Sequence, residues 1–91
     1  MSVRVQLPPI LRPVMGGERW LVGEGASIAA VLADLARKHP ALSLHLFEES
    51  GAIRRNIVFL HDGMLVRSSE ATARHVKPDD KIVLTNALAG G

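Results

Sequence analysis

The amino-acid sequence predicts an α+β fold in which one main helix packs across a mixed β-sheet of four to five strands. Several segments alternate apolar and polar residues, which is the period of a half-buried strand. One segment instead repeats apolar residues at the spacing of a helix face. With 91 residues, the chain has the size of one domain with one modest core. A single helix and a single sheet must bury their apolar faces against each other, so the helix is expected to cover the sheet.

The N-terminal part of the chain is expected to form a strand pair. Residues 3–7 and 18–22 alternate like strands, and Gly23 and Gly25 are expected to end the second one. Three prolines between these strands remove backbone donors that a sheet needs, so residues 8–17 are interpreted as one long loop.

The main helix is predicted directly after this strand pair. Ser27 is a good N-cap residue, and Pro40 is expected to close the helix, since the residue before a proline disfavours helical geometry. The apolar stripe consists of Ile28, Val31, Leu32, Leu35 and Ala36. Residues 41–47 fit either a strand or a short helix, and the helix is favoured because no turn residues separate them from the first helix.

The second half of the chain is expected to complete the sheet. Residues 56–60 form the clearest strand, residues 61–63 a tight turn, and residues 64–67 a shorter returning strand. Residues 68–76 are interpreted as a surface loop or helical turn, and residues 81–85 as the last strand. A shared core is predicted for Val5, Ile28, Val31, Leu35, Phe59 and Ile82.

The composition excludes several classes of function. The chain has no cysteine, so disulfides, thiolate metal sites and a cysteine nucleophile are excluded. The net charge is only +2 and there are three aromatic residues, whereas a nucleic-acid binder needs a clustered basic surface, often with stacking rings. No apolar run is long enough to span a membrane, and the expected location is the cytoplasm.

The remaining polar residues show no catalytic or metal-binding spacing, and no metal site is expected. Asp79 and Asp80 are interpreted as a solvated turn rather than a cation site. Arg54 and Arg55 could dock an acidic partner, but neighbours in a strand point to opposite faces, so they are interpreted as solvated edge residues. The four histidines are interpreted as surface residues: His39, His45, His61 and His75.

The C-terminus is the strongest candidate for a functional site. Residues 1–85 are expected to form the folded domain and residues 86–91 a flexible tail that ends in Gly90 and Gly91. Glycine lacks Cβ, so this end of the chain can pass through a narrow cleft. Six extended residues reach at most about 20 Å, enough to bring the terminal carboxylate into the active site of another protein. Leu88, between small residues, is expected to anchor the tail in a groove.

Two stretches carry a resemblance to a known family. The last residues read PDDKIVLTNALAGG and resemble the C-termini of small ubiquitin-like sulfur carriers of the ThiS/MoaD type. The sequence Ile10-Leu11-Arg12-Pro13, followed by Gly16-Gly17, resembles the CysO-type branch, whose members serve cysteine synthesis. The resemblance implies a ubiquitin-like β-grasp fold, with the first and last strands side by side in the middle of the sheet.

The resemblance also implies a chemistry for the terminal residue. An E1-like adenylating enzyme of the MoeB/ThiF type would use ATP to join the Gly91 carboxylate to AMP, and sulfide or a persulfide would then leave a thiocarboxylate. The sulfur would serve the synthesis of cysteine, a thiazole, molybdopterin or a specialised thio-metabolite. The chain would then be a carrier that binds no cofactor itself, not an enzyme. The residues expected to contact the partner are Asn86, Ala87, Leu88, Ala89 and Gly90.

Further partners and alternatives follow from the same resemblance. A sulfur-accepting biosynthetic enzyme and a desampylase-like metalloprotease are expected partners, whereas nucleic acid and membrane are not. The alternatives are a ubiquitin-like modifier joined to lysines through Gly91 and a β-grasp interaction module with an inert terminus. The sequence departs from the family pattern at Asn86, where proline is common, at His61, where asparagine is common, and at Asp79, where glycine is common. Aspartate tolerates left-handed backbone, so the turn at Asp79 is expected to survive.

Overall fold

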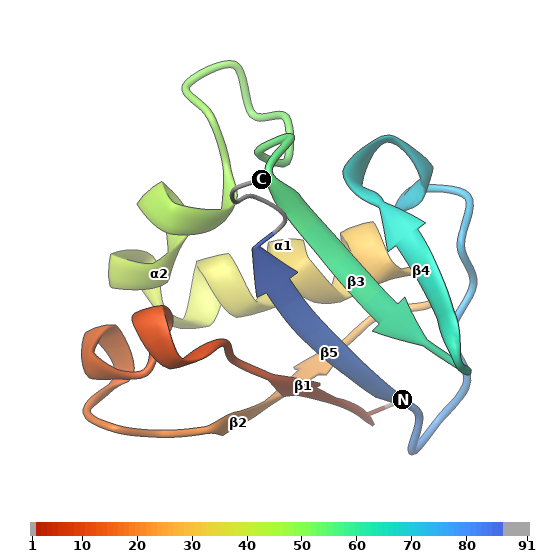
Figure 1. Cartoon of the computed structure of the whole chain (residues 1–91), viewed down its shortest axis with the longest axis horizontal. Coiled ribbons are helices and arrows are strands. Elements are labelled where there is room, and N and C mark those ends of the chain that lie inside the picture. Colours follow the sequence, from red (N-terminus) through yellow and green to blue (C-terminus); the bar gives the residue numbers. More distant parts are fainter. Residues whose placement is uncertain (1, 87–91) are drawn as a thin grey trace.

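The computed structural model describes residues 2–86, except for the side chain of Asn86. These residues form one five-stranded mixed sheet with the strand order β2-β1-β5-β3-β4, and one face of the sheet is covered by a helix (Figure 1). The strands are β1 (Ser2–Gln6), β2 (Trp20–Glu24), β3 (Ile57–His61), β4 (Met64–Arg67) and β5 (Lys81–Asn86). The helices are α1 (Ile28–Lys38), α2 (Pro40–Leu46) and three short 3₁₀ turns, η1 (Pro9–Leu11), η2 (Pro13–Met15) and η3 (Ser68–Glu70).

The first and last strands lie side by side in the centre of the sheet (Figure 1). They run parallel, with Val5 opposite Ile82, and each has an antiparallel partner on its other side, β2 and β3 respectively. This is the β-grasp arrangement, and the predicted central pairing is confirmed. Because β1 and β5 are parallel, their C-terminal ends lie at the same edge of the sheet.

Helix α1 forms where the sequence predicts it and supplies one side of the core. The Ser27 hydroxyl caps its start by accepting a hydrogen bond from the Ala30 amide at 3.1 Å. The predicted core is confirmed, since all six residues are buried in one apolar cluster: Val5, Ile28, Val31, Leu35, Phe59 and Ile82. The favoured interpretation of residues 41–47 is also correct, because a second short helix, α2, occupies this region.

Of the two glycines expected to end the second strand, Gly25 does so, directly after Glu24, and the prediction for Gly23 is wrong. Strand β2 begins two residues later than expected and contains Gly23 as a buried residue. A Cβ at this position would lie 2.9 Å from Cγ1 of Val31, which is closer than such atoms approach in proteins. Glycine is therefore present because α1 packs directly on the strand here, and not because the strand stops.

The segment between β1 and β2 is not one irregular loop, as the prolines suggested. Pro9 and Pro13 begin η1 and η2, because a proline in the first turn of a helix loses no hydrogen bond. Leu11 is buried in the core, and Arg12 Nε donates a hydrogen bond to the Leu7 carbonyl at 3.1 Å. This segment is therefore packed against the end of β1.

The boundaries of β3 and β5 differ by one residue from those predicted from the sequence. Strand β3 extends to His61, and the tight turn consists of Asp62 and Gly63, both with positive φ, as two-residue hairpins require. Asp79 also has a positive φ of 69°, and the turn before β5 forms as expected. Strand β5 includes Asn86, one residue beyond the predicted end. Among the described residues, no helix is long and apolar enough to cross a membrane.

Leu35→Ala tests the assignment of the helix face. The side chain is buried between α1 and the sheet, so its truncation is expected to lower the free energy of unfolding by about 2–5 kcal/mol. The matched control is Leu44→Ala on α2, whose side chain is 74% exposed and whose truncation should cost no more than about 0.5 kcal/mol. Denaturant unfolding of both variants gives the comparison, and equal stability would contradict the assigned face.

Asp34 provides a test by pH. Its carboxylate pairs with Lys38 Nζ at 2.8 Å and accepts the Glu24 amide at 2.9 Å, and these bonds lower the pKa of Asp34 from 3.8 to about 2. A pKa that is lower in the folded state stabilises the fold above pH 4, and this contribution is lost as the pH falls towards 2. Asp34→Asn is therefore expected to flatten the acid limb of a stability–pH curve in this interval. An unchanged limb would mean that other carboxylates control acid unfolding.

Candidate functional site

The predicted tail begins at the C-terminal end of a strand that is held on both sides. Val83 of β5 pairs with Gln6 of β1 and with Leu60 of β3, and the ladder to β3 continues to Asn86 opposite Ile57. The predicted site residues Ala87, Leu88, Ala89, Gly90 and Gly91 lie outside the described residues, as does the side chain of Asn86. What the structure shows is the point in the fold from which these residues start.

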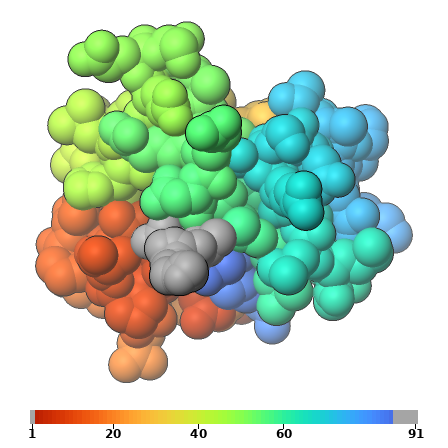
Figure 2. Space-filling model, turned by 45° about the horizontal axis from the view of Figure 1, so that its top comes forward, coloured from red at the N-terminus to blue at the C-terminus, as the bar shows by residue number. Residues whose placement is uncertain are grey.

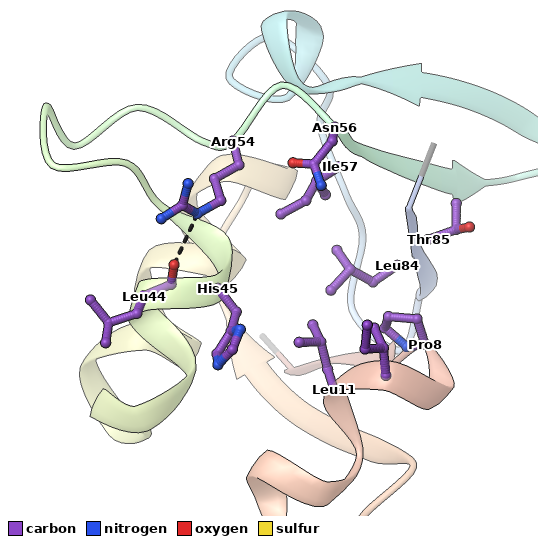
Figure 3. A pocket seen from close by; sticks show the side chains of 10 residues that line it. Pro8, Leu11, Leu44, His45, Arg54, Asn56, Ile57, Leu84 and Thr85 are labelled. Atoms are coloured by element: carbon purple, nitrogen blue, oxygen red, sulfur yellow. Dashed lines mark hydrogen bonds between the residues drawn. The ribbon is translucent and has the colours of Figure 1, made fainter. Parts of the chain in front are cut away.

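A groove of about 310 Å³ lies at this end of β5, and we call it the exit groove (Figure 3). Four segments far apart in the sequence meet there: the segment from Pro8 to Leu11, α2, the residues before and at the start of β3, and the end of β5. In Figure 2 the surface of the η1–η2 segment, in red, adjoins that of the green segment around α2 and β3. The lining residues are Pro8, Ile10, Leu11, Leu44, His45, Arg54, Asn56, Ile57, Leu84 and Thr85.

The exit groove combines apolar walls with one fixed cation. Leu11, Ile57 and Leu84 belong to the core cluster and extend it to the surface. The Arg54 side chain is half-buried, and its Nε donates to the Leu44 carbonyl of α2 at 2.9 Å (Figure 3). None of the described residues that line the groove is acidic. An apolar surface with a positioned guanidinium is suited to binding a carboxylate that is accompanied by an apolar group.

The interpretation of Arg54 as a solvated edge residue is wrong. Arg54 and Arg55 precede β3 and do not belong to a strand. The Arg54 amide donates to the Leu46 carbonyl at 2.9 Å, and with the Nε bond this attaches the segment to the last turn of α2. Sequence reasoning missed this because the hydrogen-bond acceptors belong to another element. Two signals for the groove were present in the sequence, the possibility that Arg54 docks an acidic partner and the Ile10-Leu11 motif, but nothing in it placed them together.

A polar cluster of His61, Arg74 and Asp80 lies at the opposite end of β5. The prediction that His61 is a surface histidine is wrong. The His61 side chain is only 3% exposed. Its Nδ1 accepts a hydrogen bond from Arg74 Nε at 2.9 Å, so the ring proton must lie on Nε2, which donates to Asp80 Oδ2 at 2.9 Å. The Lys77 amide and the His61 ring, in that order, hold the pKa of Asp80 below its ordinary value.

These contacts identify a structural link rather than a metal centre. His61, Asp62 and Asp80 place potential ligand atoms within 4.8 Å of one another. However, the bond from Arg74 requires a proton on Nε2 of His61, and this proton occupies the position that a metal would need. Arg74 also places a positive charge beside the ring. The cluster therefore joins the end of β3 to the turn before β5, and Asp80 is not merely a solvated turn residue.

Comparison with known proteins identifies the family to which this chain belongs. The model of the ThiS family matches residues 5–91. The sulfur carrier protein CysO of Mycobacterium tuberculosis is 31% identical over 93 residues, and the match covers all of both chains. CysO of Mycobacterium bovis matches to the same extent. The resemblance noted in the sequence thus extends over the whole chain.

Solved structures agree with this relationship. The CysO in the Amycolatopsis orientalis BexX/CysO complex has a TM-score of 0.79 at 30% identity, with 98% of this chain and 99% of that chain covered. SAMP1 from Haloferax volcanii has a TM-score of 0.82 over all of both chains, and at 24% identity this likeness concerns the fold alone. From the full-length sequence match and the ubiquitin-like β-grasp fold, we conclude that the chain belongs to the ThiS family and is similar to its CysO-type sulfur carriers.

Proposed function

We propose that this chain is a sulfur carrier whose Gly91 carboxylate is adenylated by an E1-like enzyme and then converted to a thiocarboxylate. The observation that carries the proposal is the family match, which runs to the terminal Gly91, together with full-length similarity to CysO sulfur carriers. The fold supports it, because the strand that precedes the tail is paired on both sides. The tail follows Asn86, which pairs with Ile57 of β3, and Leu84 and Thr85 just before it line the exit groove.

The proposed chemistry overcomes the low reactivity of a terminal carboxylate. With a pKa of about 3.3–3.7, a chain terminus is ionised at neutral pH and is a poor electrophile. Transfer of AMP from ATP releases pyrophosphate and gives a mixed anhydride. Hydrosulfide then attacks the carbonyl carbon, the bond to AMP breaks, and a thiocarboxylate and a proton remain. Two easier acyl steps replace one difficult step, and the catalytic groups belong to the partner, so the chain acts as a protein co-substrate.

The partner must reach a short tail. Five extended residues beyond Asn86 span at most about 17 Å, so an enzyme that reacts with Gly91 must approach the end of β5 closely. We infer an activating enzyme of the MoeB/ThiF type and a sulfur-accepting biosynthetic enzyme as successive partners in the cytoplasm. Asn86, Ala87, Leu88, Ala89 and Gly90 are proposed to contact them, with Leu88 as the anchor and the glycine positions providing passage through a narrow cleft.

Mass spectrometry tests the chemistry. The chain produced together with its activating enzyme and a sulfide source is expected to contain a population with one terminal oxygen replaced by sulfur, because no other group in the proposal is activated. Fragmentation should locate the sulfur at Gly91, and a variant that lacks Gly91 is the control. Sulfur elsewhere in the chain, or none with a competent enzyme, would refute the carrier. Isopeptide links from Gly91 to lysines of other proteins would favour a protein modifier instead.

Two tail variants test whether the position of the carboxylate matters. One alanine added after Gly91 moves the carboxylate by about 3.5 Å, and Gly90→Val adds a branched side chain where the backbone must pass closely. A misplacement of about 1 Å from attack geometry can cost roughly a hundredfold in rate. Pyrophosphate release is therefore expected to fall at least this far for both variants.

Thermal unfolding is the control for these variants. Both changes lie beyond Asn86, where the described ladder to β3 ends, so the unfolding temperature is expected to equal that of the unmodified chain. An alanine-extended chain that is activated at the normal rate, without removal of the alanine, would mean that Gly91 is not the reacting residue.

A further inference from the structure

The exit groove has no role within the fold that explains its composition. Ile10 of η1 is 69% exposed and lines the groove together with the core residues Leu11, Ile57 and Leu84. The Leu44 side chain of α2 points away from the groove, and its carbonyl faces Arg54 (Figure 3). A single exposed apolar side chain needs no explanation, but one that continues the apolar lining of a hollow is typical of a binding surface. The groove also includes the Ile10-Leu11 motif, to which the proposed chemistry of the tail assigns no role.

The charge in the groove indicates which chemical group it would accept. Arg54 takes part in none of the ion pairs found within residues 2–86. Its Nε is occupied by the Leu44 carbonyl, which orients the guanidinium, and its two terminal amino groups contact no acceptor among residues 2–86. Guanidinium groups bind carboxylates with particular geometric fit. The complementary surface therefore presents a carboxylate beside an apolar side chain.

The position of the groove indicates which protein carries that surface. Leu84 and Thr85 line the groove and pair with β3 in the last part of the ladder. Residues 87–91 span at most about 17 Å, so an enzyme that holds Gly91 in its active site also approaches this end of β5. The protein surface around the opening of that active site is then within reach of the exit groove.

We propose that the exit groove is the docking site for the activating enzyme, which inserts an apolar side chain next to a carboxylate that binds Arg54. This proposal rests on the proposed function and adds a second point of recognition to it. The tail then presents the reacting carboxylate, while the groove sets the orientation of the domain. Because the groove contacts are the same before and after adenylation, they contribute to binding and not to the chemical step.

Steady-state kinetics with the purified activating enzyme test the proposal. Arg54→Glu is expected to raise the KM for the carrier by about tenfold or more, because it places like charges opposite each other in the interface. The kcat for pyrophosphate release should stay within about twofold, since uniform binding affects KM alone. The matched control is Arg55→Glu, the same change at the neighbouring residue, which is exposed and lies outside the groove lining. Its KM should be that of the unmodified chain.

A second variant keeps the test valid if the loss of the Arg54–Leu44 bond disturbs α2. Ile10→Asp changes another part of the lining, and its side chain is exposed outside the core. It removes an apolar contact and adds a charge that repels the partner's carboxylate, so the same rise in KM is expected. Normal KM values for both Arg54→Glu and Ile10→Asp would overturn the docking proposal. A lower KM for Arg54→Glu would also overturn it, because the groove would then hold the chain's own terminal carboxylate.

A competition experiment separates this proposal from the proposed function. The alanine-extended chain, whose activation is expected to be at least about a hundredfold slower, should inhibit activation of the unmodified chain competitively through its intact groove. The same extended chain with Arg54→Glu should need about tenfold more protein for equal inhibition. Equal inhibition by both, with normal activation of the unmodified chain, would refute the docking site and leave the carrier function intact. Failure of the unmodified chain to be adenylated by any E1-like enzyme would refute the carrier function and the docking site together.

Discussion

The parallel pairing of β1 with β5 is the constraint on which the rest of this structure depends. Val5 and Ile82 lie opposite each other and are completely buried under α1. With β3 on its other side, β5 has neighbours on both edges, and its ladder to β3 continues to Asn86. A strand held in this way has little freedom of direction. The pairing with β1 reaches Val83 and the pairing with β3 reaches Asn86, so the short tail follows directly from the central strand of the sheet.

The two ends of β5 differ in a way that fits a carrier protein. At its N-terminal end, Arg74, His61 and Asp80 form a chain of hydrogen bonds that fixes one tautomer of the histidine and joins three segments. Every member has its partner within the domain. At the C-terminal end, the one hydrogen bond that the Arg54 guanidinium makes within residues 2–86 goes to a carbonyl, and the surrounding apolar side chains extend to the surface. The polar groups at the first end are satisfied internally, and the second end carries the groove that we propose as a docking site.

The exit groove follows from the same topology. Because β1 and β5 are parallel, the chain leaves β1 at the edge where β5 ends, and the proline-containing turns after β1 pack there. Helix α2 and the segment before β3 approach from the other side and are connected by Arg54. In this arrangement Pro9 and Pro13 do not merely interrupt a sheet. They begin two short helical turns that place Leu11 in the core and Ile10 at the surface.

The sequence alone determined the features that depend on local pattern. Each strand and α1 have a periodicity that can be recognised within a short stretch of chain, and this periodicity indicated the six core residues. The Ser27 cap and the Gly-Gly terminus are equally local. Tertiary structure decided what depends on distant neighbours. Gly23 remains inside β2 because Val31 of α1 packs against it, and His61 is buried because Arg74 and Asp80, 13 and 19 residues away, satisfy both ring nitrogens. The exit groove needs four separate segments, and their meeting depends on strand register and packing that no local pattern of residues encodes.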